Sequence, residues 1–320
     1  MHDKIKDSTV LHFDQLCNAG PYWSRKIASM SGSYIYFDSN ITLHDNPNNI
    51  KESALAKKRD NLIKVLSYKP DYVVCGGGFW NSTIYNNFKD IIKEYLHENK
   101  DCISFGYWGD GNMSLIKDPV AKSIFCSSID AVQIFKNKTN AYYYPHPVET
   151  KLYYPNNKIS ETYDWNFIGT NYGTTRKKDI AIMKKVSNNY ILRGQGHLPK
   201  VTPSSFEETA DIFRQSKITF NITDVKYSDL DMHFSDRILM AMCCGKFVLA
   251  NYTKGMEKVF KRGVHLDWYC NNSELKSKIN YYLQNDVIRK KVAANGYKYA
   301  RRYSLDQAIP YFFMISKKNT

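Results

Sequence analysis

Short apolar runs rich in β-branched and aromatic residues alternate with amphipathic stretches along most of the chain. Each run is a predicted strand, and those of the first half are 9–13, 33–37, 71–78, 101–108, 130–135 and 141–147. Between them, apolar positions recur at helical spacing, most clearly over 50–66 and 84–96. Strands that alternate with helices in this way predict a parallel sheet with helices on both of its faces.

The alternation stops at residues 145–160, which carry three prolines and no periodicity and therefore predict a linker. Predicted strands after the linker are 164–170, 189–194, 217–223, 246–252 and 265–269. Predicted helices are 174–186, 204–215, 235–245, 273–283 and 287–302, with a last helix within 304–320. We therefore predict the α/β class, with two Rossmann-like domains at 1–150 and 151–303. Because open α/β sheets bind ligands beyond the carboxyl ends of their strands, we expect a central cleft between the domains.

Membrane-spanning and disulfide-bonded classes are disfavoured by the sequence. No stretch approaches the roughly eighteen consecutive apolar residues of a membrane span, and the first residues lack the apolar core of a signal peptide. The seven cysteines contain no C-x-x-C pair, so neither a disulfide framework nor a zinc cage is expected. A cytoplasmic location is the expectation.

The positive charge is concentrated in the second half. The whole chain has 45 Lys and Arg against 31 Asp and Glu, a net charge of +14. Residues 1–150 carry 17 basic and 16 acidic side chains (+1), whereas residues 151–320 carry 28 and 15 (+13). Between 286 and 302, six basic residues accompany one acid (+5). Two interpretations stay open: a lysine-rich solvated surface, or a half that meets phosphates, a nucleic acid or a membrane.

The stretch 235–257 has the pattern of an anion site. Ser235 is a predicted N-cap, which places Arg237 in a first helical turn, where unpaired N–H groups and the helix dipole attract anions. Arg237 adds a side chain suited to bidentate phosphate contact. After the strand 246–252, Gly255 allows a second loop to approach a ligand closely. The alternative interpretation is an ordinary surface arginine on an ordinary strand, loop and helix.

Taken together, these motifs resemble a known family. They are R-x-x-x-A-M-x-C-G at 237–245, the apolar strand, the G-x-E loop at 255–257, the strand HLDWY and the helical stretch 273–304. The block resembles the C-terminal half of GT-B glycosyltransferases, nearest to the spore-maturation CgeB-like group, with a layout similar to DNA β-glucosyltransferases of T-even bacteriophages. The resemblance covers about 164–305, and in the first half it is one of layout. It implies sugar transfer from a nucleotide-sugar, with a UDP-sugar expected, and a last helix (304–320) that packs back toward the first domain.

The resemblance also implies which residues bind the donor. By position in the family's motifs these are Gly20, Gly169, Thr170, Arg176, Arg237, Lys254, Gly255, Met256 and Glu257. The chain departs from the pattern twice. Tyr172 replaces a second arginine of the phosphate-binding loop, and Met240 replaces the glutamate that bonds the ribose. Two alternatives follow from the second departure. Either Glu257 replaces the missing glutamate and bonds the ribose, or the protein holds the donor in a different way.

Asp110 is the predicted catalytic residue. It lies in Gly109-Asp110-Gly111, directly after the predicted strand 101–108. The resemblance implies that this aspartate removes the proton from the acceptor, because the phage enzymes have their catalytic aspartate after the same strand. A general base must lie within hydrogen-bond reach of the hydroxyl that it deprotonates. Without the resemblance, an ordinary Asp-Gly turn is the favoured interpretation.

The sequence says less about metal binding and about the identity of the acceptor. Asp229-Leu230-Asp231 has the D-x-D spacing that can share a divalent ion, but we interpret it as a solvated loop and expect no cofactor or metal. The resemblance implies two alternative acceptors. One is a hydroxymethylated base of duplex DNA, as for the phage enzymes, which the basic second half favours; the other is a cell-surface or spore glycan or protein, as for the CgeB-like group. Because Met240 replaces the ribose glutamate, a non-catalytic nucleotide- or nucleic-acid-binding protein on the same scaffold stays an alternative.

Overall fold

The structure is a computed structural model that describes residues 3–14, 20–38, 52–76, 82–109, 119–171, 173–197, 201–202 and 204–319. The chain divides into two compact units. Unit 1 consists of Met1–Tyr144 together with Asp306–Thr320, and unit 2 of Pro145–Leu305. Each unit is built on a sheet of parallel strands, and the predicted α/β class is therefore confirmed.

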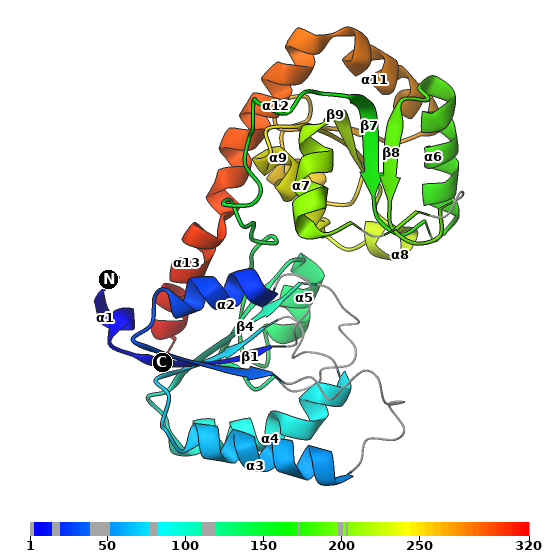
Figure 1. The fold of residues 1–320 in the computed structure, drawn as a ribbon. Coiled ribbons are helices and arrows are strands. Elements are labelled where there is room, and N and C mark those ends of the chain that lie inside the picture. Colours follow the sequence, from blue (N-terminus) through cyan, green and yellow to red (C-terminus); the bar gives the residue numbers. More distant parts are fainter. Residues whose placement is uncertain are drawn as a thin grey trace. The chain divides into compact units, whose positions relative to one another are not determined.

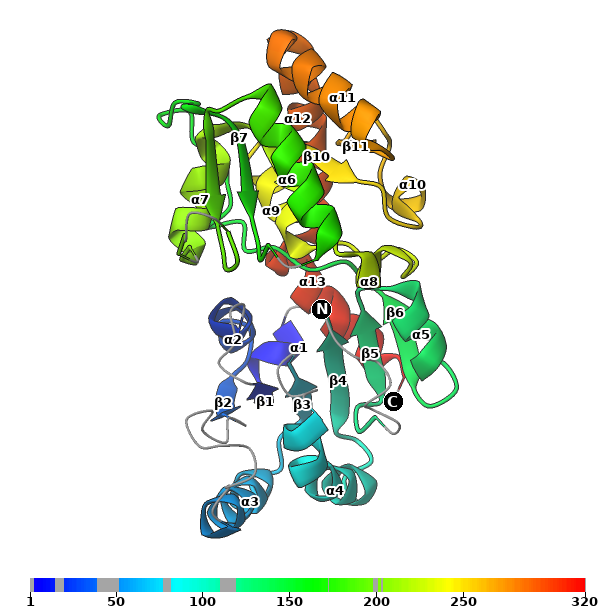
Figure 2. The same ribbon diagram turned by 90° about the vertical axis from the view of Figure 1, so that its right-hand side faces the viewer.

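Unit 1 holds a six-stranded sheet in the order β2-β1-β3-β4-β5-β6 (Figure 2). Its strands are β1 (Thr9–Asp14), β2 (Ser33–Asp38), β3 (Tyr72–Cys75), β4 (Ile103–Trp108), β5 (Ser123–Cys126) and β6 (Asn140–Tyr143). The central strands β3, β4 and β5 are buried along their whole length, as strands of a parallel sheet covered on both faces should be.

Helices cover both faces of the unit 1 sheet (Figure 1). They are α1 (Asp3–Lys6), α2 (Gly20–Ala28), α3 (Glu52–Leu66), α4 (Ser82–Glu98), α5 (Ile129–Phe135) and α13 (Leu305–Lys317). Helices α3, α4 and α5 share one core with the sheet, to which Phe88 and Phe135 contribute. On the other face, Phe312 of α13 stacks on Trp23 of α2 and Phe125 of β5, with ring centroids 5.7 and 4.0 Å apart. The last helix, apart from Leu305, is thus part of unit 1.

A buried histidine makes the stability of unit 1 depend on pH. His12 of β1 is fully buried, and its Nδ1 lies 2.9 Å from the hydroxyl of Tyr34. Burial lowers the pKa of His12 to about 3, whereas an unfolded histidine has a pKa of about 6.5. Between these values the unfolded chain binds a proton that the folded chain excludes, so stability falls as the pH drops below 6.5.

We expect His12→Gln to remove this pH dependence. A neutral glutamine keeps a polar partner for Tyr34 but does not titrate. Between pH 7 and 5.5, where carboxylates stay ionised, the wild type is expected to lose about 1 kcal/mol more unfolding free energy than the variant. Urea unfolding at the two pH values measures this difference. Equal losses in both proteins would show that His12 is protonated in the folded state.

Unit 2 holds a five-stranded parallel sheet in the order β11-β10-β9-β7-β8. Its strands are β7 (Tyr163–Ile168), β8 (Tyr190–Arg193), β9 (Ser216–Asn221), β10 (Phe247–Asn251) and β11 (Asp267–Tyr269). From β7 the chain forms β8 on one side and then crosses to form β9 on the other side of β7. The strand order therefore reverses between β7 and β9.

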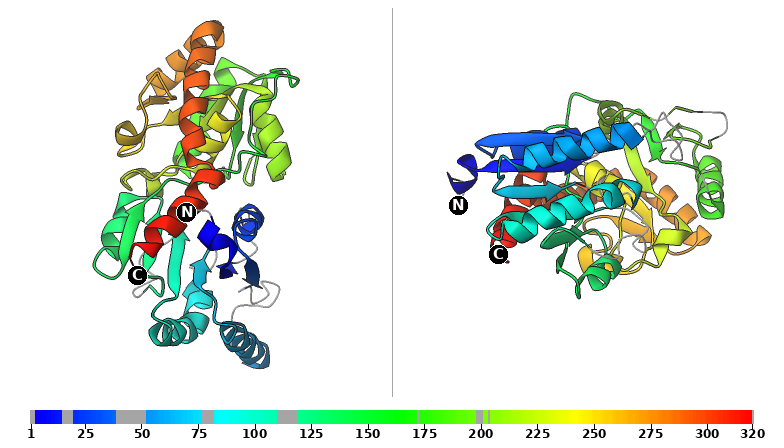
Figure 3. Two further views of the ribbon diagram at one scale, coloured as in Figure 1. Left: turned by 90° about the vertical axis from the view of Figure 1, so that its left-hand side faces the viewer. Right: turned by 90° about the horizontal axis from the view of Figure 1, so that it is seen from below.

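Two hydrophobic cores sandwich the unit 2 sheet. The helices are α6 (Thr174–Val186), α7 (Phe206–Arg214), α8 (Val225–Ser228), α9 (Asp236–Cys243), α10 (Met256–Val259), α11 (Asn272–Gln284) and α12 (Asp286–Ala300), followed by the 3-10 turn Arg301–Tyr303. Phe247 and Leu249 of β10 pack in the core with α6 and α11, whereas Val248 and Ala250 pack with α7 and α9. This alternation follows from the period of two in a strand. Figure 3 shows the long helix α12 on the outside of unit 2.

One predicted strand is wrong. Residues 130–135, DAVQIF, lie in helix α5, and the strand at this place is the short run SIFC of β5, which the pattern missed. The side chain of Ser128 caps α5 by accepting a hydrogen bond from the Ala131 amide, at 3.2 Å. Asp130 in the first turn adds a favourable charge. An N-cap signal therefore outweighs the apolar run. No helix in the part of the chain that the structure describes is long and apolar enough to cross a membrane.

Candidate functional site

The candidate site lies at the carboxyl end of the unit 2 sheet, where the strand order reverses between β7 and β9. Open α/β sheets bind ligands in the crevice at such a point, because the two following loops diverge from it. The loop after β7 carries Gly169, Thr170 and Gly173, and β9 is followed by Ile222 and Asp224. These two loops therefore form the framework of the site.

Arg176 of α6 bridges the two loops. Its Nε donates to the carbonyl of Ile222, and one terminal nitrogen donates to the carbonyl and the hydroxyl of Thr170, all at 2.9 to 3.0 Å. These bonds fix the plane of the guanidinium. The second terminal nitrogen has no hydrogen bond within the described part of the chain, so it is available to a ligand.

Arg237 brings a second positive charge to the same place. It lies in the first turn of α9, where the Ser235 side chain accepts a bond from the Arg237 amide at 3.4 Å. Among the described residues, the Arg237 guanidinium forms neither a hydrogen bond nor an ion pair. Burial and then the positive charge of Arg237 lower the pKa of Arg176, and Asp224 opposes them. The two arginines are thus close enough to repel each other.

Asp236 and His146 complete the electrostatics of this end of α9. Burial alone would raise the pKa of Asp236, but electrostatic interactions, first with the Arg237 guanidinium and then with the His146 side chain, hold it below its ordinary value. Asp236 also accepts a bond from the Arg237 amide at 2.8 Å. Sequence reasoning did not single out Asp236 or His146; the only sequence signal was the position of Asp236 beside Arg237.

The start of α6 adds backbone donors. Its N-cap is Gly173, which has no side chain to bond the first amides of the helix. Gly173 has a positive φ of 89°, and a Cβ at this position would lie 3.2 Å from a carboxylate oxygen of Asp224. Glycine therefore keeps the start of α6 open beside the two arginines.

The loop after β10 is tied to the same edge of the sheet. Asn251, the last residue of β10, accepts a bond from the Thr223 amide at 2.7 Å and donates to the Thr223 carbonyl at 3.1 Å. Lys254 is exposed in this loop, and Glu257 is exposed in the first turn of α10, where it accepts a bond from the Tyr252 hydroxyl at 3.0 Å. Their side chains remain available to a ligand.

Gly255 and Met256, at the end of that loop and the start of α10, contribute to the structure of the backbone there and present no side chain to a ligand. Met256 is fully buried in the core of unit 2, and its amide donates to the Thr253 carbonyl. Gly255 has a φ of 79°, and a Cβ there would lie 2.2 Å from a carboxylate oxygen of Asp231. The position therefore requires glycine both for its backbone conformation and for space.

We expect Gly255→Ala to destabilise the protein more than Gly263→Ala. Gly263 also has a positive φ, 69°, but nothing lies within 4 Å of the Cβ that alanine would add. Gly263→Ala should therefore cost only the left-handed strain, about 1–2 kcal/mol. Gly255→Ala adds steric overlap with Asp231 and Met232, roughly 1–3 kcal/mol more. Urea unfolding of both variants measures the difference, and equal costs would contradict the described loop.

Other predicted site residues lie elsewhere or outside the described residues. Asp110 and Tyr172 lie outside them, and Gly20 begins α2 of unit 1. Met240, where the resemblance expects the ribose glutamate, is buried in α9. Asp231 forms an ion pair with Lys258 at 2.7 Å. Within the described ranges, no group of three or more His, Cys, Asp and Glu side chains could hold a metal ion.

Comparison with solved structures identifies the architecture. A glycosyltransferase from Rickettsia africae superposes with a TM-score of 0.70 over 98% of each chain, at 12% identity. Anabaena HepE in complex with UDP-glucose matches at 0.66 and 12% identity, covering 97% of this chain and all of that one. The fold is GT-B. An α-glucosyltransferase in complex with UDP-glucose and DNA containing an abasic site also matches this fold at 0.66 and 11% identity, over 97% of this chain and 99% of the other.

Sequence comparison locates the similarity in the second part of the GT-B chain. Residues 176–311 match the family model described as glycosyl transferase-like. A protein of Methanocaldococcus jannaschii described as an uncharacterized glycosyltransferase is 24% identical over 133 residues. That match covers 41% of this chain and 36% of the relative, so the chain spans about a third of the length of this curated relative. The family match includes both Arg176 and Arg237.

Proposed function

We propose that this GT-B protein transfers a sugar from a nucleotide-sugar to an acceptor hydroxyl, and that the donor is a UDP-sugar. The observation that carries the proposal is the pair Arg176 and Arg237 at the reversal point of the unit 2 sheet, with the Arg237 guanidinium unpaired among the described residues. Two arginines that repel each other favour an anion between them. The structural neighbours in complex with UDP-glucose support a nucleoside diphosphate as that anion.

The proposed reaction is a displacement at the anomeric carbon of the sugar. Asp110 accepts the proton of the acceptor hydroxyl, whose oxygen forms the new bond to the anomeric carbon. The bond from that carbon to the diphosphate oxygen breaks, and the nucleoside diphosphate leaves with the electron pair. Arg176, Arg237 and the first amides of α6 stabilise the negative charge of this leaving group, because their positions are fixed before the reaction begins.

The remaining proposed donor contacts are of two kinds. Gly169 and Thr170 shape the loop that Arg176 holds, and Gly20 marks the start of α2 in unit 1. Lys254 and Glu257 are exposed after β10, next to Gly255 and Met256, which hold the backbone of that loop. Because Met240 is buried, we propose that Glu257 is the carboxylate that bonds the ribose.

Titration calorimetry with UDP tests the donor site without requiring the acceptor. We expect UDP to bind the full chain with a stoichiometry of one. A protein that takes up no UDP and no other nucleoside diphosphate at millimolar concentration would contradict the proposal. Binding without any turnover of a nucleotide-sugar would instead favour the alternative of a non-catalytic nucleotide-binding protein.

For the acceptor we propose a hydroxymethylated base of duplex DNA. The excess of +13 in residues 151–320 and the neighbour in complex with DNA support it. A base must leave the helical stack to reach a catalytic group. The alternative acceptor is a cell-surface or spore glycan or protein, as in the CgeB-like group. Gel shifts of duplex DNA at increasing salt separate the two, since phosphate contacts weaken steeply with ionic strength. A chain that does not bind DNA at low salt would exclude the DNA acceptor.

A further inference from the structure

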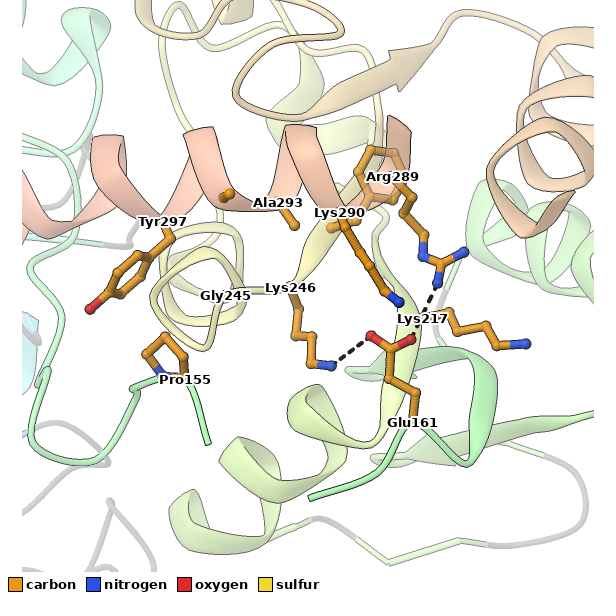
Figure 4. A pocket seen from close by; sticks show the side chains of 11 residues that line it. Pro155, Glu161, Lys217, Gly245, Lys246, Arg289, Lys290, Ala293 and Tyr297 are labelled. Carbon is orange, nitrogen blue, oxygen red and sulfur yellow. Dashed lines mark hydrogen bonds and ion pairs between the residues drawn. The ribbon is translucent and has the colours of Figure 1, made fainter. Parts of the chain in front are cut away.

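A second concave site lies at the opposite, amino end of the unit 2 sheet. It is a cavity of about 230 Å³ (Figure 4). Two of its walls come from the start of β9 at Lys217 and from Lys246, the residue before β10. The others come from the segment before β7 at Pro155 and Glu161, and from one side of α12. Lys217 lies near the start of β9, and Ile222, which belongs to the candidate donor site, follows the end of that strand. The two residues are five positions apart, which corresponds to ~17 Å along an extended strand. The cavity is therefore distinct from the donor site.

Cations converge on a single carboxylate in this cavity. Glu161 accepts a bond from Lys246 at 2.8 Å and from Arg289 at 3.2 Å. Figure 4 shows the Lys290 side chain pointing toward the same carboxylate from the next position of α12. The Arg289 side chain is only 1% exposed and also donates to the Tyr282 carbonyl at 2.7 Å, so it is held rigidly.

The neighbouring acids do not balance the positive charge completely. Lys217 pairs with Asp164 at 2.8 Å. Asp286 forms two ion pairs, with Arg289 at 2.5 Å and with Lys290 at 3.4 Å. In the second pair, the side chains of Asp286 and Lys290 are both more than half exposed. Four cations thus share three carboxylates. An exposed pair such as Lys290 and Asp286 contributes little, so Lys290 can turn to a ligand at small cost.

The other end of the cavity is apolar. Pro155, Ala293 and Tyr297 line it, and Figure 4 shows the Tyr297 ring beside Pro155. Ala293 and Tyr297 are four residues apart and so share one side of α12. Gly245 has a φ of 72° and closes this end, since a Cβ there would lie 3.3 Å from the Pro155 ring. The cavity therefore combines a cationic end with an aromatic and aliphatic end.

We propose that this cavity binds a small organic anion, a phosphate or carboxylate group attached to an aromatic or branched apolar body. Lys246 and Lys290 contact the anionic group, and Pro155, Ala293 and Tyr297 contact the apolar body. The volume is below the roughly 300–1,000 Å³ of pockets for drug-sized ligands, so the ligand is smaller than those. The proposal does not depend on sugar transfer, because no residue of the cavity belongs to the donor site.

Titration calorimetry of the full chain with phenyl phosphate tests the proposal. We expect one saturable site, with inorganic phosphate binding several-fold more weakly because it lacks the ring. Lys290→Met and Lys246→Met should each weaken phenyl phosphate binding about tenfold. Lys291→Met is the matched control, because Lys291 is the next residue of α12 and exposed but does not line the cavity. It should change the affinity less than twofold.

A variant of the donor site distinguishes binding in the cavity from binding at the donor site. Arg237→Ala should leave phenyl phosphate binding within twofold of the wild type. A loss in Arg237→Ala without a loss in Lys290→Met would place the ligand at the donor site and overturn the proposal. So would the absence of saturable binding to the wild type at millimolar phenyl phosphate. Lys290 is largely exposed, so Lys290→Met should fold normally even if Lys246→Met leaves Glu161 poorly paired.

Discussion

Replacing Asp110 by asparagine should reduce sugar transfer by on the order of 10²–10⁴-fold, which is the usual contribution of a general base. Asparagine has nearly the same shape but cannot accept the proton of the acceptor hydroxyl. Because the donor phosphates are assigned to unit 2, the affinity for UDP should stay within about twofold. Initial rates with a turned-over nucleotide-sugar, together with UDP titration calorimetry, measure the two effects separately.

Asp101→Asn is the matched control for this experiment. Asp101 is an exposed aspartate that precedes β4 at its amino end, whereas Asp110 follows the strand at its carboxyl end. The control variant should transfer sugar at the wild-type rate. Near-normal turnover by Asp110→Asn would remove Asp110 from the mechanism and leave the Asp-Gly sequence as an ordinary turn.

Arg237→Ala should weaken UDP binding about 10- to 100-fold. A hydrogen bond to a charged group contributes about 1.5–3 kcal/mol, and 1.4 kcal/mol corresponds to a factor of ten in affinity. Arg237 is the cleaner choice of the two arginines, because Arg176 also holds the carbonyls of Thr170 and Ile222 and its loss would disturb the loops. Titration calorimetry with UDP gives the change directly.

Arg302→Ala controls for the general loss of a positive charge from unit 2. Arg302 is exposed, and its guanidinium lies 5.5 Å from the ring centroid of Tyr299. This variant should bind UDP as the wild type does. If Arg237→Ala and Arg302→Ala bind UDP equally well, Arg237 does not contact the donor.

The periodicity of the sequence was enough to predict most of the fold. Helix α6 has the predicted bounds, 174–186, and Gly173 precedes it as the N-cap. The region around β5 and α5 was not predictable in the same way. Four apolar residues, SIFC, are too short to distinguish a buried strand from a loop, and DAVQIF fits both periods.

The charged residues could be counted from the sequence, but the burial and the partners of their side chains could not be predicted from it. Arg289 was one of six basic residues between 286 and 302 for which a solvated surface was one of two interpretations, yet it is 1% exposed and bonded to Glu161 from a distant segment. The closeness of Arg176 and Arg237 likewise depends on the crossing of the chain from β8 to β9. Helical spacing says which residues share a side of one helix, but only tertiary packing brings side chains of different elements together.

The most direct test of the central claim is the release of nucleoside diphosphate from a panel of nucleotide-sugars, measured with the full chain. The panel should contain UDP-, GDP-, ADP- and dTDP-linked sugars, each with duplex DNA containing hydroxymethylated bases and with water alone as acceptors. We expect release from a UDP-sugar, with a rate that falls in Asp110→Asn. No release from any member of the panel, by a protein that also does not bind UDP, would contradict the assignment of this chain as a glycosyltransferase.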